Sequence, residues 1–208
     1  VAALANPSAP VAAAAAAAEA LGHLARNGGS LAADQLSAAA APRLLVRAVA
    51  CGGEALAPAA AIAIGALADA AVALRDEMSA AGPFAPLTLL AAHRRGVAQA
   101  SAADAIRALV RGSSPNRQAA VAAAAVEVMS AIVSQPTCDS PEAAAAAAKC
   151  LASLLLGDEP LQSAFVARGG LQSLGAMRQR KETKAAADEV VQALADCFDK
   201  AVVAAGLG

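Results

Sequence analysis

The sequence contains no tryptophan and no tyrosine, and three phenylalanines are its only aromatic residues among 208. A peptide groove lined with aromatic rings is therefore excluded, and stacking on nucleic-acid bases is disfavoured. The two histidines, His23 and His93, are far apart, and we expect both on helix surfaces. No GxGxxG, phosphate-binding loop, HExxH or GxSxG motif occurs. The sequence thus indicates a protein that is not an enzyme, with no catalytic, cofactor-binding or metal-binding residues.

Cysteine is also sparse, and its placement carries no metal or redox pattern. The four cysteines form no CxxC pair and are Cys51, Cys138, Cys150 and Cys197. We expect Cys150 to be a small buried apolar residue rather than a reactive thiol. Without a disulfide-rich pattern or a signal peptide, an intracellular, cytoplasmic protein is expected. The net charge of -1 gives no overall attraction to nucleic acid or to an anionic membrane.

A long apolar stretch, Ala55 to Leu74, carries a single charge, Asp69. Pro58, Gly65 and Asp69 interrupt it and most of its bulk is alanine, whereas a membrane span needs about 20 predominantly apolar residues. We therefore expect no membrane association; a chain that partitions into detergent would indicate the opposite. Because the sequence begins with valine, we also expect it to be part of a longer protein.

What the chain has in abundance is alanine, at roughly a third of all residues. Alanine is the best helix former and buries little area per residue. Valine and isoleucine recur at helical spacing and do not alternate as they would in strands. These features predict an all-α protein of closely packed helices.

A short apolar pattern recurs five times and divides the chain into units. It reads LGHL at 21–24, IGAL at 64–67, IRAL at 106–109, LASL at 151–154 and VQAL at 191–194. The spacing of about 40 to 45 residues is that of helical repeats, whose units bury their apolar faces only by stacking on their neighbours. We predict one repeat domain over 1–208, with a partial unit at 10–29 and units at 30–69, 70–112, 113–157 and 158–204.

The last unit shows the clearest local pattern, the sequence DEPLQSAFVARGGLQSL at 158–174. Asp158 and Pro160 predict a helix start, Gly169 and Gly170 a corner, and Leu171 the start of a second helix. A similar corner is expected at 82–83, and a helix cap at Asp139 or Ser140. Residues 116–134 contain no glycine or proline, so that unit has either two fused helices or a corner made by other residues.

These residues resemble the armadillo repeat, in which Phe165, Gly169, Gly170, Leu171 and Leu174 match the corner between the first and second helices. The recurring apolar pattern matches the third helix more loosely. HEAT repeats, which have the same period and two helices per unit, are the close alternative. The resemblance implies a right-handed armadillo-like α-solenoid of about four three-helix repeats plus the partial N-terminal one, with the third helices lining a concave groove.

The resemblance also places a partner-binding groove, although this chain lacks the family's ladder of peptide-binding asparagines. The equivalent positions hold His23, Ala66, Ala108, Ser153 and Ala193, so binding of nuclear-localisation signals in the importin-alpha manner is not expected. What remains is a stripe of mixed charge along the third helices. The candidate groove residues are Glu19, His23, Arg26, Asp69, Asp104, Arg111, Lys149, Ser153, Glu189 and Asp196. The alternative for each of them is an exposed helix residue that only contacts water.

A candidate basic patch lies in the last unit and consists of Arg178, Arg180, Lys181 and Lys184. It would suit an acidic protein partner; the alternative is a solvated loop or helix end, where cations are favourably placed near helix carbonyls. The function predicted is a non-catalytic scaffold for protein partners, with no small-molecule substrate. Its composition, with much alanine and no tyrosine or tryptophan, resembles that of proteins encoded by GC-rich genomes, including green algae. For such a protein the armadillo resemblance implies a component of a ciliary axoneme or another cytoskeletal assembly. The alternative is a regulatory repeat domain of a larger enzyme, such as a ubiquitin-ligase-type protein.

Overall fold

The computed structural model describes residues 1–6, 8–135 and 140–204, with the side chains of 30 and 196–204 left out of the description. Throughout these residues the regular structure is α-helical, and no strand occurs in them. The expected all-α class is therefore confirmed. Its cause is the high alanine content, which favours helix at nearly every position outside the turns.

The helices form one partial unit and four units of three helices each. The partial unit has α1 (Ala2–Ala5) and α2 (Val11–Asn27), of which α1 is not predicted by the sequence. The first helices of the complete units are α3 (Gly29–Ala38), α6 (Val72–Ala80), α9 (Ser114–Ala122) and α12 (Glu159–Ala167). The second helices are α4 (Ala41–Cys51), α7 (Phe84–His93), α10 (Ala125–Val133) and α13 (Gly170–Arg178). The third helices are α5 (Leu56–Ala70), α8 (Val97–Val110), α11 (Pro141–Leu155) and α14 (Lys181–Ala204). Three helices per unit agree with the armadillo resemblance and not with the HEAT alternative.

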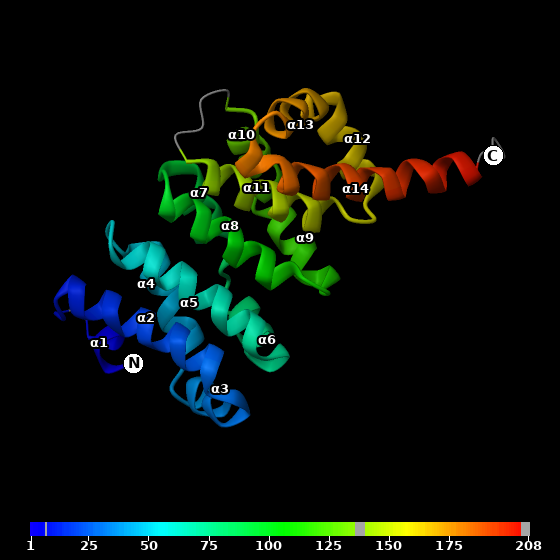
Figure 1. Cartoon of the computed structure of the whole chain (residues 1–208). Coiled ribbons are helices and arrows are strands. Elements are labelled where there is room, and N and C mark those ends of the chain that lie inside the picture. Colours follow the sequence, from blue (N-terminus) through cyan, green and yellow to red (C-terminus); the bar gives the residue numbers. More distant parts are fainter. Residues whose placement is uncertain (7, 136–139, 205–208) are drawn as a thin grey trace.

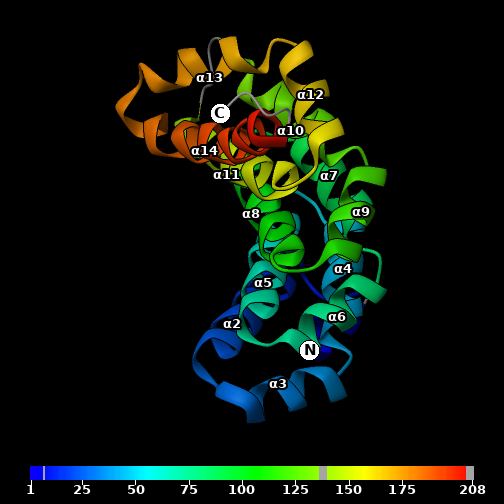
Figure 2. The same cartoon turned by 90° about the vertical axis from the view of Figure 1, so that its right-hand side faces the viewer.

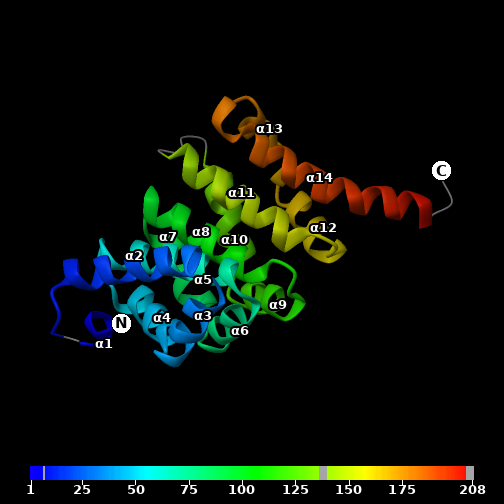
Figure 3. The same cartoon turned by 60° about the horizontal axis from the view of Figure 1, so that its bottom comes forward.

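The units stack so that equivalent helices lie side by side. The third helices pack in the order α2, α5, α8, α11 and α14, which we call the inner column, and the second helices pack in the order α4, α7, α10 and α13. Figure 2 shows the inner column along one side of a curved molecule, with α4, α6, α7 and α9 along the other. The two termini lie at opposite ends of the stack, and the last turns of α14 extend past the other helices (Figures 1 and 3).

Small residues let α2, α5 and α8 of the inner column approach one another closely. A Cβ added to Gly22 on α2 would lie 3.3 Å from the Cα of Ala63 on α5. One unit later, a Cβ on Gly65 would lie 3.5 Å from the Cα of Ala105 on α8. Ala63 and Ala105 are themselves buried, so backbone packs on backbone with little side chain between. The alanine and glycine content of the sequence thus sets the spacing of the stack.

Each corner between a first and a second helix contains one residue in the left-handed conformation. These residues are Ala40, Gly82, Ala124 and Gly169, with φ of 53°, 73°, 61° and 85°. Gly82 and Gly169 are the predicted corners. Ala124 decides between the two alternatives for residues 116–134, the segment without glycine or proline. Its helices are not fused, and an alanine makes the corner. An L-residue pays about 1–2 kcal/mol in this conformation, so two of the four corners are strained.

Helix starts follow the predicted capping residues where these can be compared. The Asp158 carboxylate accepts a hydrogen bond from the Leu161 N–H (3.1 Å), and the Ser140 hydroxyl accepts one from Ala143 N–H (3.2 Å). Each has a proline in the first turn of the helix that follows. Ser140 is therefore the cap of α11, while Asp139, the other candidate, lies outside the described residues.

A further cap recurs where a third helix passes into the next unit. Arg75, Asn116 and Gln162 each donate a hydrogen bond to a carbonyl seven residues earlier, at Ala68 (3.0 Å), Leu109 (2.8 Å) and Leu155 (2.7 Å). The last four carbonyls of a helix have no partner within it, so each of these side chains satisfies a group that would otherwise be orphaned. Three different side chains perform the same task at equivalent positions.

The apolar stretch from Ala55 to Leu74 is divided between α5 and α6, with extended backbone at Ala71. Across the described part of the chain, no helix combines the length and the apolar character that a membrane crossing requires.

Candidate functional site

The accessible face of the inner column repeats its geometry from one unit to the next. Helix α8 packs between α5 and α11 and against α7 and α9, which leaves one stripe of the helix accessible. After the first turn of α8 this stripe continues every three or four positions, at Ala100, Asp104, Arg107 and, just past the helix end, Arg111. The corresponding residues are Pro58, Ile62, Gly65 and Asp69 on α5, and Glu142, Ala145, Lys149, Ala152 and Ser153 on α11. We call this stripe on the three helices the inner surface.

The inner surface has small residues along its middle and charges beside them. Ile62 is its large apolar side chain, with 41% of its surface exposed. Gly65, Ala100, Ala145 and Ala152 are half-buried and leave the backbone of the helices close to the surface. A partner segment that lies here would therefore contact a shallow floor between charged side chains.

Most of the candidate groove residues are accessible. Glu19, His23, Arg26, Asp69, Asp104, Arg111 and Glu189 are exposed, while Lys149 and Ser153 are half-buried. The side chain of Asp196 lies outside the described residues. The exposure of His23, and of His93 on α7, agrees with the expectation that both histidines lie on helix surfaces.

Several of these charges are partnered within the chain. Arg111 forms an ion pair with Asp69 (3.2 Å), which joins α5 to the end of α8. Arg26 Nη2 lies 3.4 Å from His23 Nδ1 on the same helix. Asp104 lies 3.5 Å from Arg107 Nε, an ion pair without hydrogen-bond geometry. Arg107 belongs to the inner surface and was not among the residues predicted from the sequence.

Three of the five positions of the missing asparagine ladder are buried, while His23 is exposed and Ser153 is half-buried. Ala66, Ala108 and Ala193 are 6%, 2% and 5% exposed, so their methyl groups are packed between helices. Ser153 donates its hydroxyl hydrogen bond to the Lys149 carbonyl of its own helix (3.2 Å). Recognition at this surface must therefore come from the charged neighbours.

Cys150 lies directly beneath the inner surface. It is fully buried, and burial raises the pKa of its thiol, with Asp104 raising it further and Arg107 opposing both. A neutral buried thiol is a packing group, as the sequence predicts. Cys51 is exposed and unpaired, while Cys138 and the side chain of Cys197 lie outside the described residues.

The candidate basic patch is at the junction of α13 and α14, and the structure divides it. Arg178, in the last turn of α13, pairs with Asp188 at 2.8 Å. Arg180, Lys181 and Lys184 are exposed. Arg178 and Arg180 lie at the carbonyl end of α13, whereas Lys181 and Lys184 lie in the first turns of α14.

Among the described side chains, no group of three or more His, Cys, Asp or Glu is placed to hold a metal ion. Several cavities lie along the edge where second helices turn into third helices. Two of them, about 360 and 370 Å³, share Leu90 and Arg94 and form what we call the edge groove. One is bounded by Gly53, Glu54, Pro58, Arg95, Val97 and Ala98, and the other by Val49, Ala50, Gly52, Ala85, Pro86, Leu89 and His93.

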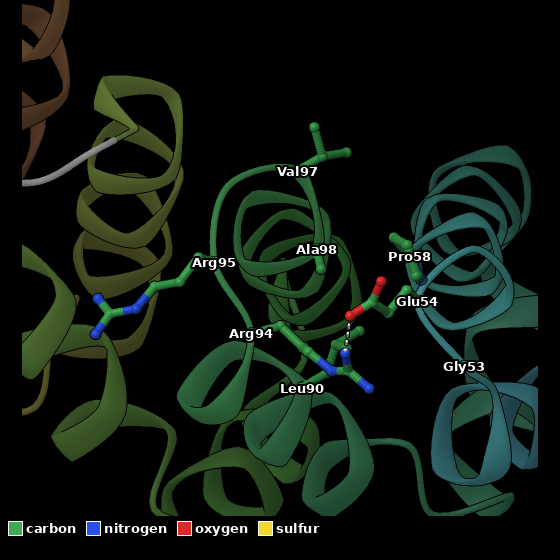
Figure 4. Close-up of a pocket in the computed structure, with 8 residues that line it drawn as sticks. All are labelled: Gly53, Glu54, Pro58, Leu90, Arg94, Arg95, Val97 and Ala98. Carbon is green, nitrogen blue, oxygen red and sulfur yellow. Dashed lines mark hydrogen bonds and ion pairs between the residues drawn. The ribbon is translucent and has the colours of Figure 1, made fainter.

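Arg94 crosses the edge groove to form an ion pair with Glu54 of the preceding unit (3.2 Å), whereas Arg95 points the other way, as Figure 4 shows. Arg95 donates to Gln135 of the following unit. The sequence alone does not predict this groove, because its walls come from segments about 40 residues apart along the chain. The pairing of Glu54 with Arg94 at one repeat period is the signal that would have indicated it.

No protein-family model matches the chain, and no curated protein matches it. Solved structures match its fold. One engineered protein aligns with a TM-score of 0.83 at 20% identity, over 92% of this chain and 78% of that one. The armadillo-repeats-only protein of Plasmodium falciparum gives a TM-score of 0.72 at 15% identity, over 86% and 79%. A designed armadillo repeat protein in complex with the peptide (KR)4 gives 0.58 at 16% identity, over 86% and 92%.

These similarities, together with the three-helix units, show an armadillo-like α-solenoid. Identities this low establish the fold and leave the function to the surfaces of this chain.

Proposed function

We propose that this chain is a non-catalytic scaffold that binds a protein partner along its inner surface. The observation that carries the proposal is the repeated accessible stripe on α5, α8 and α11, with Ile62, Asp104 and Lys149 at equivalent positions. A surface that repeats once per unit suits an extended partner segment, because each unit contacts successive residues of that segment.

The charges on this surface favour a partner with both signs of charge. Asp104 is 54% exposed and lies beside Arg107, and Lys149 is the next charge along the column. Exposed ion pairs such as Asp69 with Arg111 contribute little to folding, so they can be exchanged for contacts with a partner. Complementary charges would select the partner and its direction along the groove.

The designed armadillo protein that holds the peptide (KR)4 supports this use of the fold. In the present chain, buried alanines occupy most of the ladder positions, and the inner surface carries cations as well as carboxylates. We therefore expect a mixed-charge segment and not a purely basic one. Two finer predictions stay open to test. One is that the partner belongs to a ciliary axoneme or another cytoskeletal assembly, and the alternative is that this chain is a regulatory domain of a larger enzyme.

Affinity purification with a matched pair of variants tests the proposal. The tagged chain, the inner-surface variant Asp104→Lys and the control Asp34→Lys would each be incubated with extract of the source cells. Asp34 is exposed on α3, and its substitution changes the charge equally. We expect proteins retained by the wild type and by Asp34→Lys to fall about tenfold with Asp104→Lys. Equal retention by both folded variants would contradict the use of the inner surface.

A further inference from the structure

The edge groove consists of two adjoining cavities that share Leu90 and Arg94. Leu90, 7% exposed, gives both an apolar wall, and Arg94 adds a cation to both. Leu89 and Val97 are 57% and 70% exposed, one at each cavity. Large aliphatic side chains this exposed, on either side of an arginine, form a surface with a definite chemical pattern: apolar, positive, apolar.

In the free chain, the Arg94 guanidinium is paired with a carboxylate of the same polypeptide. The Glu54 side chain is 91% exposed, and within the described part of the chain its carboxylate pairs with the Arg94 guanidinium alone. Glu54 precedes α5 in the loop, and no helix packing fixes its side chain. An exposed pair of this kind contributes little, so a carboxylate from outside can replace it.

We propose that the edge groove docks an extended acidic segment of a partner protein, with its carboxylate on Arg94 in place of Glu54 and an apolar side chain in each flanking cavity. In an extended segment, side chains two positions apart point to the same side. The expected sequence pattern is therefore apolar, any residue, acidic, any residue, apolar. Glu54 then acts as an internal competitor that weakens binding until a better-fitting segment displaces it.

The lining favours a peptide over other anions. Its charged side chains are Arg94 and Glu54, since Arg95 turns away toward Gln135, so displacement of Glu54 leaves the Arg94 guanidinium as the charge facing the groove. No aromatic side chain lines either cavity, so nucleic-acid bases have nothing to stack on. A small inorganic anion would leave both apolar cavities unfilled. The edge groove shares only Pro58 with the inner surface and contains neither Asp104 nor Lys149, so this proposal and the one above fail independently.

Selection from a phage library of random linear peptides on the immobilised full chain supplies the probe. We expect the enriched peptides to carry Asp or Glu with apolar residues two positions before and after it. Synthetic copies of the enriched peptides, labelled with a fluorophore, should bind the wild type in an anisotropy titration. Their affinity should fall about tenfold with Arg94→Ala, because a charge-assisted pair is lost. It should rise about threefold with Glu54→Ala, because the competitor is removed.

The matched controls are Arg168→Ala and Glu127→Ala. Glu127 on α10 and Arg168, just past the end of α12, also form an exposed pair between successive units (3.4 Å), away from the edge groove. Both control variants should bind the peptides as the wild type does. The proposal is overturned if the enriched peptides lack an acidic residue, or if folded Arg94→Ala binds them as well as Arg168→Ala does.

Discussion

The ring of Phe165 on α12 fills the space that a side chain on Gly170 would need. A Cβ built on Gly170 would lie 2.4 Å from Phe165 Cε1, and Phe165 itself is 4% exposed. Gly169, one residue earlier, has φ of 85° and turns the chain. The two glycines therefore have separate tasks: the first makes the corner, and the second lets the buried ring lie against the start of α13.

Alanine substitutions at two glycines of α13 should change stability in opposite directions. Gly170→Ala must displace the Phe165 ring, and we expect it to lower the free energy of unfolding by about 1–3 kcal/mol. Gly175→Ala places its methyl group where no atom lies within 4 Å, and it should gain about 1 kcal/mol from helix propensity. Chemical denaturation followed by circular dichroism measures both. Two changes of the same sign would contradict the assigned contact.

The same residues show how far sequence alone reaches. Phe165, Gly169 and Gly170 form a pattern that predicts both helices and the corner between them, because glycine has few structural reasons to occur twice in succession inside a helical segment. The corner at Ala124 has no such signal. Its alanine is forced into the left-handed region by the packing of α9 and α10, which only the folded stack provides.

Glycine at the two alanine corners should stabilise the protein. Ala40 and Ala124 are exposed and have positive φ, so Ala→Gly removes strain without removing packing. After the entropy cost of glycine, we expect a gain of about 0.5–1 kcal/mol for each. The control is Ala119→Gly, on an exposed interior position of α9, which should lose about 1 kcal/mol. Thermal melts of the three variants would show the opposite signs; a loss at both corners would contradict the left-handed assignment.

Asn116 should be required for the junction between the second and third complete units. Its side chain is 7% exposed and donates to the Leu109 carbonyl at the end of α8 (2.8 Å). Asn116→Leu leaves that carbonyl without this donor, and we expect a loss of about 1–3 kcal/mol. Asn27→Leu, at an exposed position, should change stability by less than about 0.5 kcal/mol. Urea titration distinguishes them, and equal effects would argue against the cap.

Cys150 should resist alkylation in the folded protein. Burial raises the pKa of its thiol, so the reactive thiolate is absent at neutral pH, and the reagent has no access. In a chain with Cys138→Ser and Cys197→Ser, iodoacetamide should modify exposed Cys51 readily and Cys150 only after denaturation. Modification of both at similar rates under native conditions would show that the helices above Cys150 open easily.

The two candidate surfaces differ in how well sequence could predict them. The exposure of Asp69, Asp104 and Arg111 follows from helical spacing once the third helices are identified. Their pairing does not, because Asp69 and Arg111 meet only when two units stack. The edge groove is a stronger example, since Glu54 and Arg94 come from loops of separate units and each cavity has walls from both.

Crosslinking mass spectrometry on the native assembly tests the central claim, that this solenoid binds a protein through its inner surface, most directly. Lys149 is on the inner surface, whereas Lys181 and Lys184 lie at the start of α14 and report on the candidate basic patch. We predict reproducible links from Lys149 to a different polypeptide. Links that join these lysines only to other parts of their own polypeptide, with none to a partner, would contradict the scaffold function and favour the regulatory-domain alternative.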